Sequence, residues 1–181
     1  GYSPEKHPLS RGFDEFFGFL HGAHPYLQVN DNFGMSVMRG REAVKEVDYL
    51  TDAFAREAAA FIERNKDVPF FTYLPFNAVH GPLESIQKYL DRFKDIADAK
   101  RRTFAAMLSA MDDGVGTVLT TIRKLGLEND TLVIFISDNG GPTAQTTSAN
   151  TPLSGFKGDV FEGGIRVPYM MQWKGHIPEG Q

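Results

Sequence analysis

Apolar residues return every three or four positions between residues 48 and 64, which places them on one face of a helix. Asp48 stands at the start of this pattern, where a carboxylate can accept hydrogen bonds from the backbone N–H groups of the first turn. We therefore predict a helix over 48–64 with Asp48 as its N-cap. The apolar positions of this helix are Tyr49, Leu50, Ala53, Phe54, Ala58, Phe61 and Ile62.

The longest helical pattern covers residues 99–125. Its apolar residues step by three or four, or sit adjacent on the same face. Gly126 follows directly and is a natural C-terminal stop, because glycine adopts the left-handed conformation that commonly ends a helix. The apolar positions are Phe104, Met107, Leu108, Met111, Val115, Val118, Leu119, Ile122 and Leu125.

Two short apolar runs flank this long helix and read as strands. Residues 70–74 form an aromatic run, and residues 131–136 are apolar on both faces, as in a parallel sheet covered by helices. With the helix between them, the two runs predict a βαβ unit, so we expect them to be parallel members of one sheet. A last strand near residues 167–173 is expected to join the same sheet.

The start of the chain is irregular, with turn residues such as Asn30-Asp31-Asn32. An aromatic cluster in this part is expected to attach it to a core; its members are Phe13, Phe16, Phe17 and Phe19. No linker divides the chain. We therefore predict one α/β domain, or part of one, over residues 1–181.

The composition is that of a globular protein, with 41% hydrophobic and 23% charged residues among 181. The net charge of −4 lacks the basic footprint of a nucleic-acid-binding protein. No apolar run approaches the ~18 residues of a transmembrane helix, and no signal peptide is visible. Cysteine is absent, which excludes disulfides, thiol nucleophiles and thiolate metal sites within these residues.

The first candidate for chemistry is the run Ser-Asp-Asn-Gly-Gly at 137–141, directly after the predicted strand 131–136. In open parallel sheets, ligands bind at the carboxyl ends of strands. Asp138 and Asn139 carry the oxygen donors that suit a hard cation such as Ca²⁺ or Mg²⁺. Taken alone, the same residues favour a plain turn, because Asp-Asn-Gly is common in turns.

His80 is the second candidate, in the sequence Asn-Ala-Val-His-Gly-Pro-Leu at 77–83. It lies just past the other predicted strand, so it is expected on the same rim of the sheet as Asp138. An imidazole there can donate a proton to a leaving group. The simpler interpretation of a single histidine is a hydrogen-bonded structural role.

The third candidate is Lys157, which stands between glycines in the segment 153–158. Small neighbours let its ammonium group approach a bound anion as a point charge, although a solvated surface lysine is the commoner case. Arg166 is expected to pair with an acid near the start of the last strand. A cation site, a histidine and a lysine on one rim together suit an enzyme that stabilises charge on a transferred sulfuryl or phosphoryl group.

The ordered motifs resemble the formylglycine-dependent sulfatase family, in the branch of arylsulfatases A and B and N-acetylgalactosamine-6-sulfatase. The resemblance runs from end to end, and Gly1 matches the last glycine of the family's Gly-Lys-Trp-His-Leu-Gly motif. The motifs are Tyr-Leu-Thr-Asp (49–52), Pro-Phe-Phe-Thr-Tyr-Leu (69–74), His-Gly-Pro-Leu (80–83), Ala-Met-Asp-Asp-Gly-Val-Gly (110–116), Ser-Asp-Asn-Gly-Gly (137–141), Lys-Gly (157–158) and Glu-Gly-Gly-Ile-Arg-Val-Pro (162–168).

This resemblance implies an α/β sandwich of the alkaline-phosphatase type with a mainly parallel central sheet. It implies that Asp138 and Asn139 are ligands of the active-site cation, usually Ca²⁺ and alternatively Mg²⁺. It implies that His80 contacts the sulfate and helps to protonate the leaving alcohol, and that Lys157 contacts sulfate and leaving-group oxygens. In the family, a hydrated formylglycine attacks sulfur and inorganic sulfate is released.

Several parts of the family pattern do not occur in residues 1–181. The Cys/Ser-x-Pro-x-Arg motif that carries the formylglycine precursor, the early Asp-Asp cation ligands and the small C-terminal subdomain are missing. We therefore expect a fragment of a sulfatase catalytic domain that is inactive alone. Its substrate is expected to be a sulfated small molecule or glycan, and family resemblance favours export to the periplasm, the cell exterior or the lysosome.

Two alternatives remain open from the sequence. A phosphoryl or phosphonate ester hydrolase of the same superfamily needs similar residues, because sulfate and phosphate esters present similar tetrahedral oxyanions. A non-catalytic module could use the same rim to bind anionic glycans. Among residues of the early loops, His21, His24 and Tyr26 are candidates for a substrate pocket, since loops often carry specificity.

Overall fold

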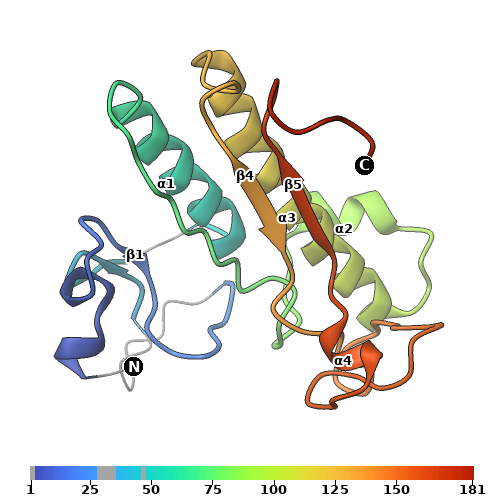
Figure 1. Ribbon diagram of the computed structural model, residues 1–181. Coiled ribbons are helices and arrows are strands. Elements are labelled where there is room, and N and C mark those ends of the chain that lie inside the picture. Colours follow the sequence, from blue (N-terminus) through green and yellow to red (C-terminus); the bar gives the residue numbers. More distant parts are fainter. Residues whose placement is uncertain (1–2, 28–35, 46–47) are drawn as a thin grey trace.

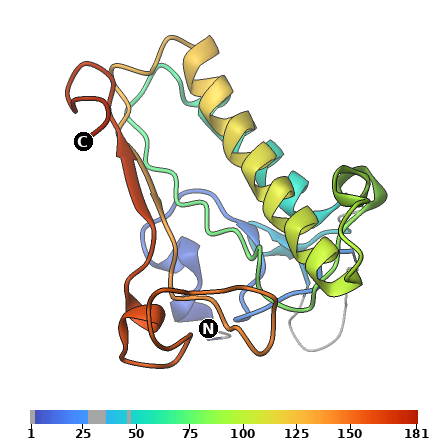
Figure 2. The ribbon, with the colours of Figure 1, turned by 90° about the vertical axis from the view of Figure 1, so that its right-hand side faces the viewer.

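The computed structural model describes residues 3–27, 36–45 and 48–181. Two features named from the sequence, Gly1 and the turn at Asn30-Asp31-Asn32, lie outside the described residues. Two long helices form one layer of the structure, and a two-stranded sheet lies to one side of them (Figures 1 and 2). The extended chain that follows the first helix runs between the helices and the sheet (Figure 2). In the described part of the chain no helix is long and apolar enough to cross a membrane.

The long helices are α1 (Leu50–Arg64) and α3 (Ala99–Lys124), which pack against each other. The prediction of a helix over 48–64 is confirmed, but its N-cap is wrong. Tyr49 occupies the N-cap position with non-helical backbone angles and makes no side-chain cap. The Asp48 carboxylate instead pairs with the Arg56 guanidinium, two turns along the helix. The Asp48 side chain therefore forms an ion pair with Arg56 and does not form the helix cap that the sequence predicted.

Both ends of α3 are set by local chemistry. The Asp98 side chain caps the start by accepting a hydrogen bond of 2.6 Å from the backbone N–H three residues on. At the other end Gly126 has a φ of +72°, and the Leu127 N–H reaches back to the Ile122 carbonyl at 3.0 Å. This is the Schellman arrangement, so the predicted stop at Gly126 is confirmed.

The apolar run at 131–136 forms β4 (Val133–Ile136), which pairs with β5 (Tyr169–Gln172). The last predicted strand therefore joins the same sheet, as expected, and the two strands are antiparallel. The predicted parallel partner is not found, because residues 70–74 are extended but make no strand pairing with the described residues. They run in the same direction as β4, as the βαβ interpretation required (Figure 1). A ladder, however, needs adjacent hydrogen-bonded backbones.

A second small sheet attaches the N-terminal part to α1. It consists of β1 (Phe17–Gly18), β2 (Met38–Arg39) and β3 (Glu42–Ala43), paired antiparallel in that order. Phe17 packs edge-on against Phe54 of α1, with ring centroids 6.0 Å apart. The aromatic cluster thus contributes to a core, as predicted. The remaining short elements are η1 (Pro4–Lys6), η2 (Pro8–Ser10), α2 (Gln87–Leu90), η3 (Asp91–Phe93) and α4 (Glu162–Ile165).

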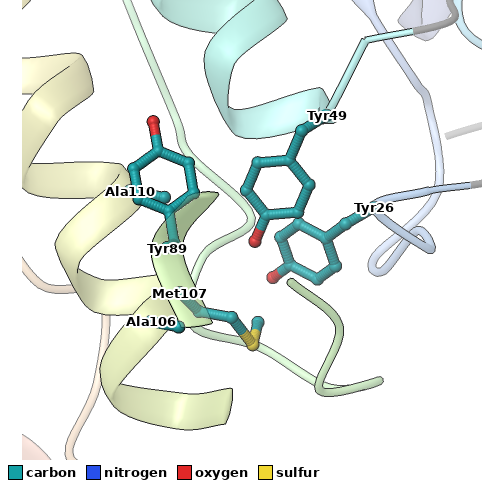
Figure 3. Packing of buried hydrophobic residues seen from close by; sticks show 6 residues of the cluster. All are labelled: Tyr26, Tyr49, Tyr89, Ala106, Met107 and Ala110. Atoms are coloured by element: carbon teal, nitrogen blue, oxygen red, sulfur yellow. The ribbon is translucent and has the colours of Figure 1, made fainter. Parts of the chain in front are cut away.

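A cluster of buried tyrosines lies where α1, α2 and α3 meet the early loop (Figure 3). Its rings are face to face or tilted at centroid distances of about 6 Å. Loop residues 78, 79 and 83 pack against its edge, so this cluster supports the loop that carries His80. The members of the cluster are Tyr26, Tyr49, Tyr89, Ala106, Met107 and Ala110.

Large apolar side chains are exposed on the extended segment and on β4. Phe71 and Tyr73 are 74% and 68% exposed, and Ile134 and Ile136 are 50% and 56% exposed. Along both segments, exposed residues alternate with half-buried ones, which is the pattern of a strand with one uncovered face. In the described residues this face has no cover.

Candidate active site

Asp138 and Asn139 sit in the loop that leaves β4. The loop is held at its base, where the Ser137 N–H donates to the Pro168 carbonyl at 3.1 Å and the Ser137 hydroxyl donates to the Asn139 carbonyl at 2.9 Å. The Asn139 side-chain amide donates to the Gly140 carbonyl at 3.1 Å. That contact uses the nitrogen, so the side-chain oxygen of Asn139 remains available as a ligand.

The Asp138 carboxylate is exposed and has no hydrogen-bond or ion-pair partner among the described residues. A carboxylate and an amide oxygen on adjacent residues are the donors that a hard cation such as Ca²⁺ takes. The fit is partial, because no group of three His, Cys, Asp or Glu side chains in the described chain could hold a metal ion. These two residues therefore supply part of a cation site.

Glycines bring the segment with Lys157 up to the Asp138 loop. A Cβ on Gly140 would stand 1.7 Å from the Gly163 carbonyl oxygen, and one on Gly163 would stand 2.2 Å from the Gly155 carbonyl oxygen. The backbones are also bonded, from Gly140 N–H to the Gly164 carbonyl at 2.9 Å. Only glycine permits three segments to approach this closely. The double glycines at 140–141 and 163–164 thus explain the packing.

Asn150 ties the same segments together, and sequence reasoning missed it. Its side-chain oxygen accepts from the Gly141 N–H at 3.0 Å, and its amide donates to the Gly141 carbonyl at 3.0 Å. The same amide donates to the Gly155 carbonyl at 3.1 Å. A lone asparagine in a polar loop carries no sequence signal of this role, since its partners are backbone groups nine and five residues away.

Lys157 occupies the tip of a turn. The Asp159 N–H donates to the Phe156 carbonyl at 2.9 Å, and the Asp159 carboxylate accepts from the Phe156 N–H at 3.0 Å. Gly158 has a φ of +99°, which the third position of a type II turn requires. Lys157 is half-buried and has no ion-pair partner among the described residues. Its charge is therefore not neutralised by a neighbouring carboxylate.

His80 projects from the loop after the extended segment. Its backbone N–H donates to the Asn77 carbonyl at 2.7 Å. Its ring Nδ1 lies 2.8 Å from the Gly81 carbonyl oxygen. Since a carbonyl can only accept, Nδ1 carries a proton and Nε2 is the nitrogen left to meet a ligand. The side chain is exposed.

The structure thus packs the backbone segments that carry Asp138, Asn139 and Lys157 against one another in one loop cluster. The extended segment 70–74 and strand β4 both run downward in Figure 1. The His80 loop and the Asp138 loop therefore follow segments that run in the same direction. We keep as a prediction that the four side chains lie within about 10 Å of each other, the range over which charges couple through one Debye length. Arg166 pairs with Glu162 at 3.4 Å, as the sequence indicated.

The early-loop residues proposed for a substrate pocket are placed differently. His24 and Tyr26 are each 2% exposed, so they face the interior rather than a ligand. His24 stacks on Phe19, and its Nδ1 lies 2.5 Å from the Pro25 carbonyl oxygen. Only His21 of the three is exposed. Aromatic packing, which a loop composition does not reveal, accounts for the burial.

A family model described as Sulfatase matches residues 1–181, which is the whole chain. The chain belongs to the sulfatase family. Arylsulfatase J of Mus musculus is 33% identical over 92% of this chain and 29% of its own length. N-acetylgalactosamine-6-sulfatase of the same organism is 32% identical over 100% of this chain and 37% of its own length. The chain therefore spans about a third of the length of these sulfatases.

Solved structures agree with this fold. The structure of Ps i-CgsB in complex with k-i-k-neocarrahexaose is 38% identical, with a TM-score of 0.93 over 99% of this chain and 44% of that one. A putative sulfatase of Bacteroides fragilis is 17% identical, with a TM-score of 0.70 over 90% of this chain and 38% of that one. The α/β fold of the alkaline-phosphatase-like sulfatases is thereby confirmed for this sulfatase chain.

Proposed function

We propose that the protein containing this chain is a sulfatase that hydrolyses sulfuric esters of an oligosaccharide and releases inorganic sulfate. The observation that carries the proposal is the sulfatase family match over all 181 residues. The loop cluster agrees with it, because its packed backbone segments carry the Asp138 carboxylate and the Lys157 ammonium group, neither of which has an ion-pair partner among the described residues. Such a pairing suits a site that holds a cation and an anion together.

Asp138 and Asn139 are the residues that would hold Ca²⁺, or alternatively Mg²⁺, through their side-chain oxygens. When bound, the cation would stabilise negative charge on the sulfate oxygens. The covalent sulfuryl acceptor, a formylglycine, is expected from sequence outside residues 1–181, because this chain has no cysteine and no serine in the required motif.

His80 would protonate the departing alcohol. Its Nδ1 proton is held by the Gly81 carbonyl at 2.8 Å, which fixes the tautomer and directs Nε2 outward. In the imidazolium form, Nε2 carries the second proton and can give it to the oxygen of the breaking ester bond. A poor leaving group such as a sugar alkoxide needs this proton more than an acidic phenol does.

Lys157 would contact the sulfate and the leaving oxygen. The turn at residues 156–159 presents the side chain at its tip, and Gly158 leaves room on one side of it. An ammonium group without a carboxylate partner offers its full charge to an incoming anion. Its part in the reaction is stabilisation of the charge that develops as the ester bond breaks.

An oligosaccharide sulfate is the substrate class that the relatives favour. One similar structure, that of Ps i-CgsB, was solved with k-i-k-neocarrahexaose, and one relative is named N-acetylgalactosamine-6-sulfatase. In line with the family resemblance, we propose that the protein is exported to the periplasm, the cell exterior or the lysosome.

The deciding experiment compares ester classes on the full-length protein. Purified enzyme with Ca²⁺ is given sulfated oligosaccharides, 4-nitrophenyl sulfate, 4-nitrophenyl phosphate and a phosphonate monoester, and released sulfate or phosphate is quantified by ion chromatography. Faster sulfate release supports the proposal. Preference for the phosphate or phosphonate ester would identify a phosphoryl hydrolase, and oligosaccharide binding without any turnover would identify a glycan-binding module.

A further inference from the structure

The position of His80 depends on the backbone of its loop. The imidazole is exposed, and its one hydrogen bond among the described residues goes to the adjacent Gly81 carbonyl. In the described part of the chain no side chain makes a hydrogen bond to the ring. Anything that sets the backbone of residues 77–80 therefore also sets the direction of Nε2.

The hydroxyl group of Tyr26 holds this backbone. It lies 2.6 Å from the Asn77 carbonyl oxygen and 2.9 Å from the His80 carbonyl oxygen, and its single O–H is shared between these two acceptors. These two carbonyls stand at the ends of one tight turn, since the His80 N–H bonds to the Asn77 carbonyl. A single buried hydroxyl thus closes the turn that presents His80.

Tyr26 is itself held by Glu84 and Tyr49, which are also hydrogen-bonded to each other. Its backbone N–H donates to the Glu84 carboxylate at 2.8 Å. Its ring stacks on Tyr49, with centroids 5.7 Å apart and an interplanar angle of 26°. The Tyr49 hydroxyl in turn donates to the Glu84 carbonyl at 2.9 Å. Tyr26, Tyr49 and Glu84 therefore brace both sides of the loop between residues 77 and 84.

The third tyrosine of the cluster provides the comparison. In Figure 3 the Tyr26 and Tyr49 hydroxyls point the same way, and the Tyr89 hydroxyl points the opposite way. Tyr89 donates to the Asp52 carboxylate at 2.6 Å and makes no bond to the loop. Like Tyr26, Tyr89 is a buried tyrosine, but its hydroxyl donates to a carboxylate instead of to the loop carbonyls. Loop positioning is therefore a separate property from membership of the core.

We propose that Tyr26 is a positioning residue for His80, which it orients by hydrogen bonds from its hydroxyl to the Asn77 and His80 carbonyls. The proposal rests on the proposed function, in which His80 protonates the leaving alcohol. Loss of the hydroxyl removes this donor from the His80 carbonyl and leaves the Asn77 carbonyl with the His80 N–H as its donor, so the turn relaxes and Nε2 moves from the ester oxygen.

The test compares Tyr26→Phe with Tyr89→Phe in the full-length protein. For a sugar sulfate, whose alkoxide needs protonation, Tyr26→Phe is expected to lower kcat on the order of 10–100-fold, part of what a general acid supplies. For 4-nitrophenyl sulfate, whose phenol is a good leaving group, the loss is expected to be smaller. Tyr89→Phe is expected to change both rates alike and little. Equal losses on the two substrates in Tyr26→Phe would overturn the proposal.

Combination with His80→Ala separates positioning from general damage. Once His80 is gone, Tyr26→Phe is expected to cost no further activity on the sugar sulfate, because the two residues act through one step. Additive losses would contradict the proposal. If Tyr26→Phe does not fold, Glu84→Gln tests the same brace, with a smaller loss in the same direction.

A readout without turnover keeps this inference distinct from the proposed function. With carbon-13 labelled histidine, the His80 ring signal, assigned by its loss in His80→Ala, is expected to shift in Tyr26→Phe and to stay in place in Tyr89→Phe. An unmoved signal would refute the positioning role whether or not the protein hydrolyses sulfate. If the signal shifts but the protein has no sulfatase turnover, the positioning role of Tyr26 is supported and the proposed function is refuted.

Discussion

Gly140 and Gly163 approach so closely that a Cβ on Gly140 would stand 1.7 Å from the Gly163 carbonyl oxygen. Gly140 follows the candidate cation ligands, and Gly163 packs on the segment that leads to Lys157. The contact therefore couples the two charged parts of the candidate site through backbone alone. No side chain can be added there without separating them.

Gly140→Ala should destabilise the protein and disturb the site. The added methyl group meets backbone that cannot move aside, and overpacking of this kind costs about 1–3 kcal/mol or more. Gly116→Ala is the matched control, because Gly116 lies inside α3 and a Cβ added there would meet nothing within 4 Å. That control should stabilise by about 1 kcal/mol. Denaturant unfolding measures both, and similar stability changes in the two variants would contradict the packing described above.

Asn150→Asp should loosen the link between the Asp138 loop and the Lys157 segment. The variant keeps the size of the side chain but replaces the amide donor by a carboxylate facing the Gly141 and Gly155 carbonyls. We expect a loss of about 1–3 kcal/mol in the free energy of unfolding. Asn129→Asp adds the same charge at an exposed site and should change stability little. Equal effects would show that charge, rather than the bridge, matters.

Asp138→Ala and Lys157→Ala should each lower sulfatase activity of the full-length protein by about 10²-fold or more, because each removes a charge that stabilises the reacting group. Lys100→Ala, at an exposed position in the first turn of α3, is the control and should retain activity. Calorimetry should show weaker Ca²⁺ binding in Asp138→Ala and unchanged binding in Lys100→Ala. Unchanged Ca²⁺ affinity in Asp138→Ala would remove it from the cation site.

The tyrosine cluster should make stability fall at alkaline pH. Burial raises the pKa values of Tyr26 and Tyr89, helped by the Glu84 carboxylate near Tyr26 and the Asp52 carboxylate near Tyr89. Burial also raises the pKa of Tyr49 to about 12 from an ordinary 10. The folded state therefore favours the protonated phenol. This contribution is complete below pH 10 and is lost as pH rises through 12. Unfolding measured across this range should show the decline, and Tyr49→Phe should flatten part of it; an unchanged slope in Tyr49→Phe would be inconsistent with the burial.

The polypeptide of residues 1–181 should show no sulfatase turnover by itself. It contains no cysteine and no serine in the formylglycine motif, so it lacks a covalent acceptor for the sulfuryl group. The exposed Phe71 and Ile134 faces should also make it prone to aggregate. Purified 1–181 and the full-length protein are compared on a chromogenic aryl sulfate, with light scattering as the second readout. Multiple turnovers by residues 1–181 with Ca²⁺ would refute this prediction.

The sequence by itself determined the elements whose signals are local. Helical periodicity predicted α1 and α3, and Gly126 predicted the end of α3, because a glycine with positive φ can terminate a helix from its own conformation. The apolar run predicted β4, and the ordered motifs indicated the sulfatase family before any coordinates. Each of these inferences depends on residues that are neighbours in the chain.

Only the tertiary structure decided the features that join distant residues. Residues 70–74 have the composition of a strand, yet a strand requires a partner backbone, and β4 pairs antiparallel with β5 instead. Asp48 forms an ion pair with Arg56 and does not cap the helix. Tyr26 is buried and bonds to the carbonyls of the His80 loop, so it does not line an open pocket. A side chain's partner, and so its role, depends on which groups the fold brings within hydrogen-bond distance, and residues 26 and 80 are brought together only by packing.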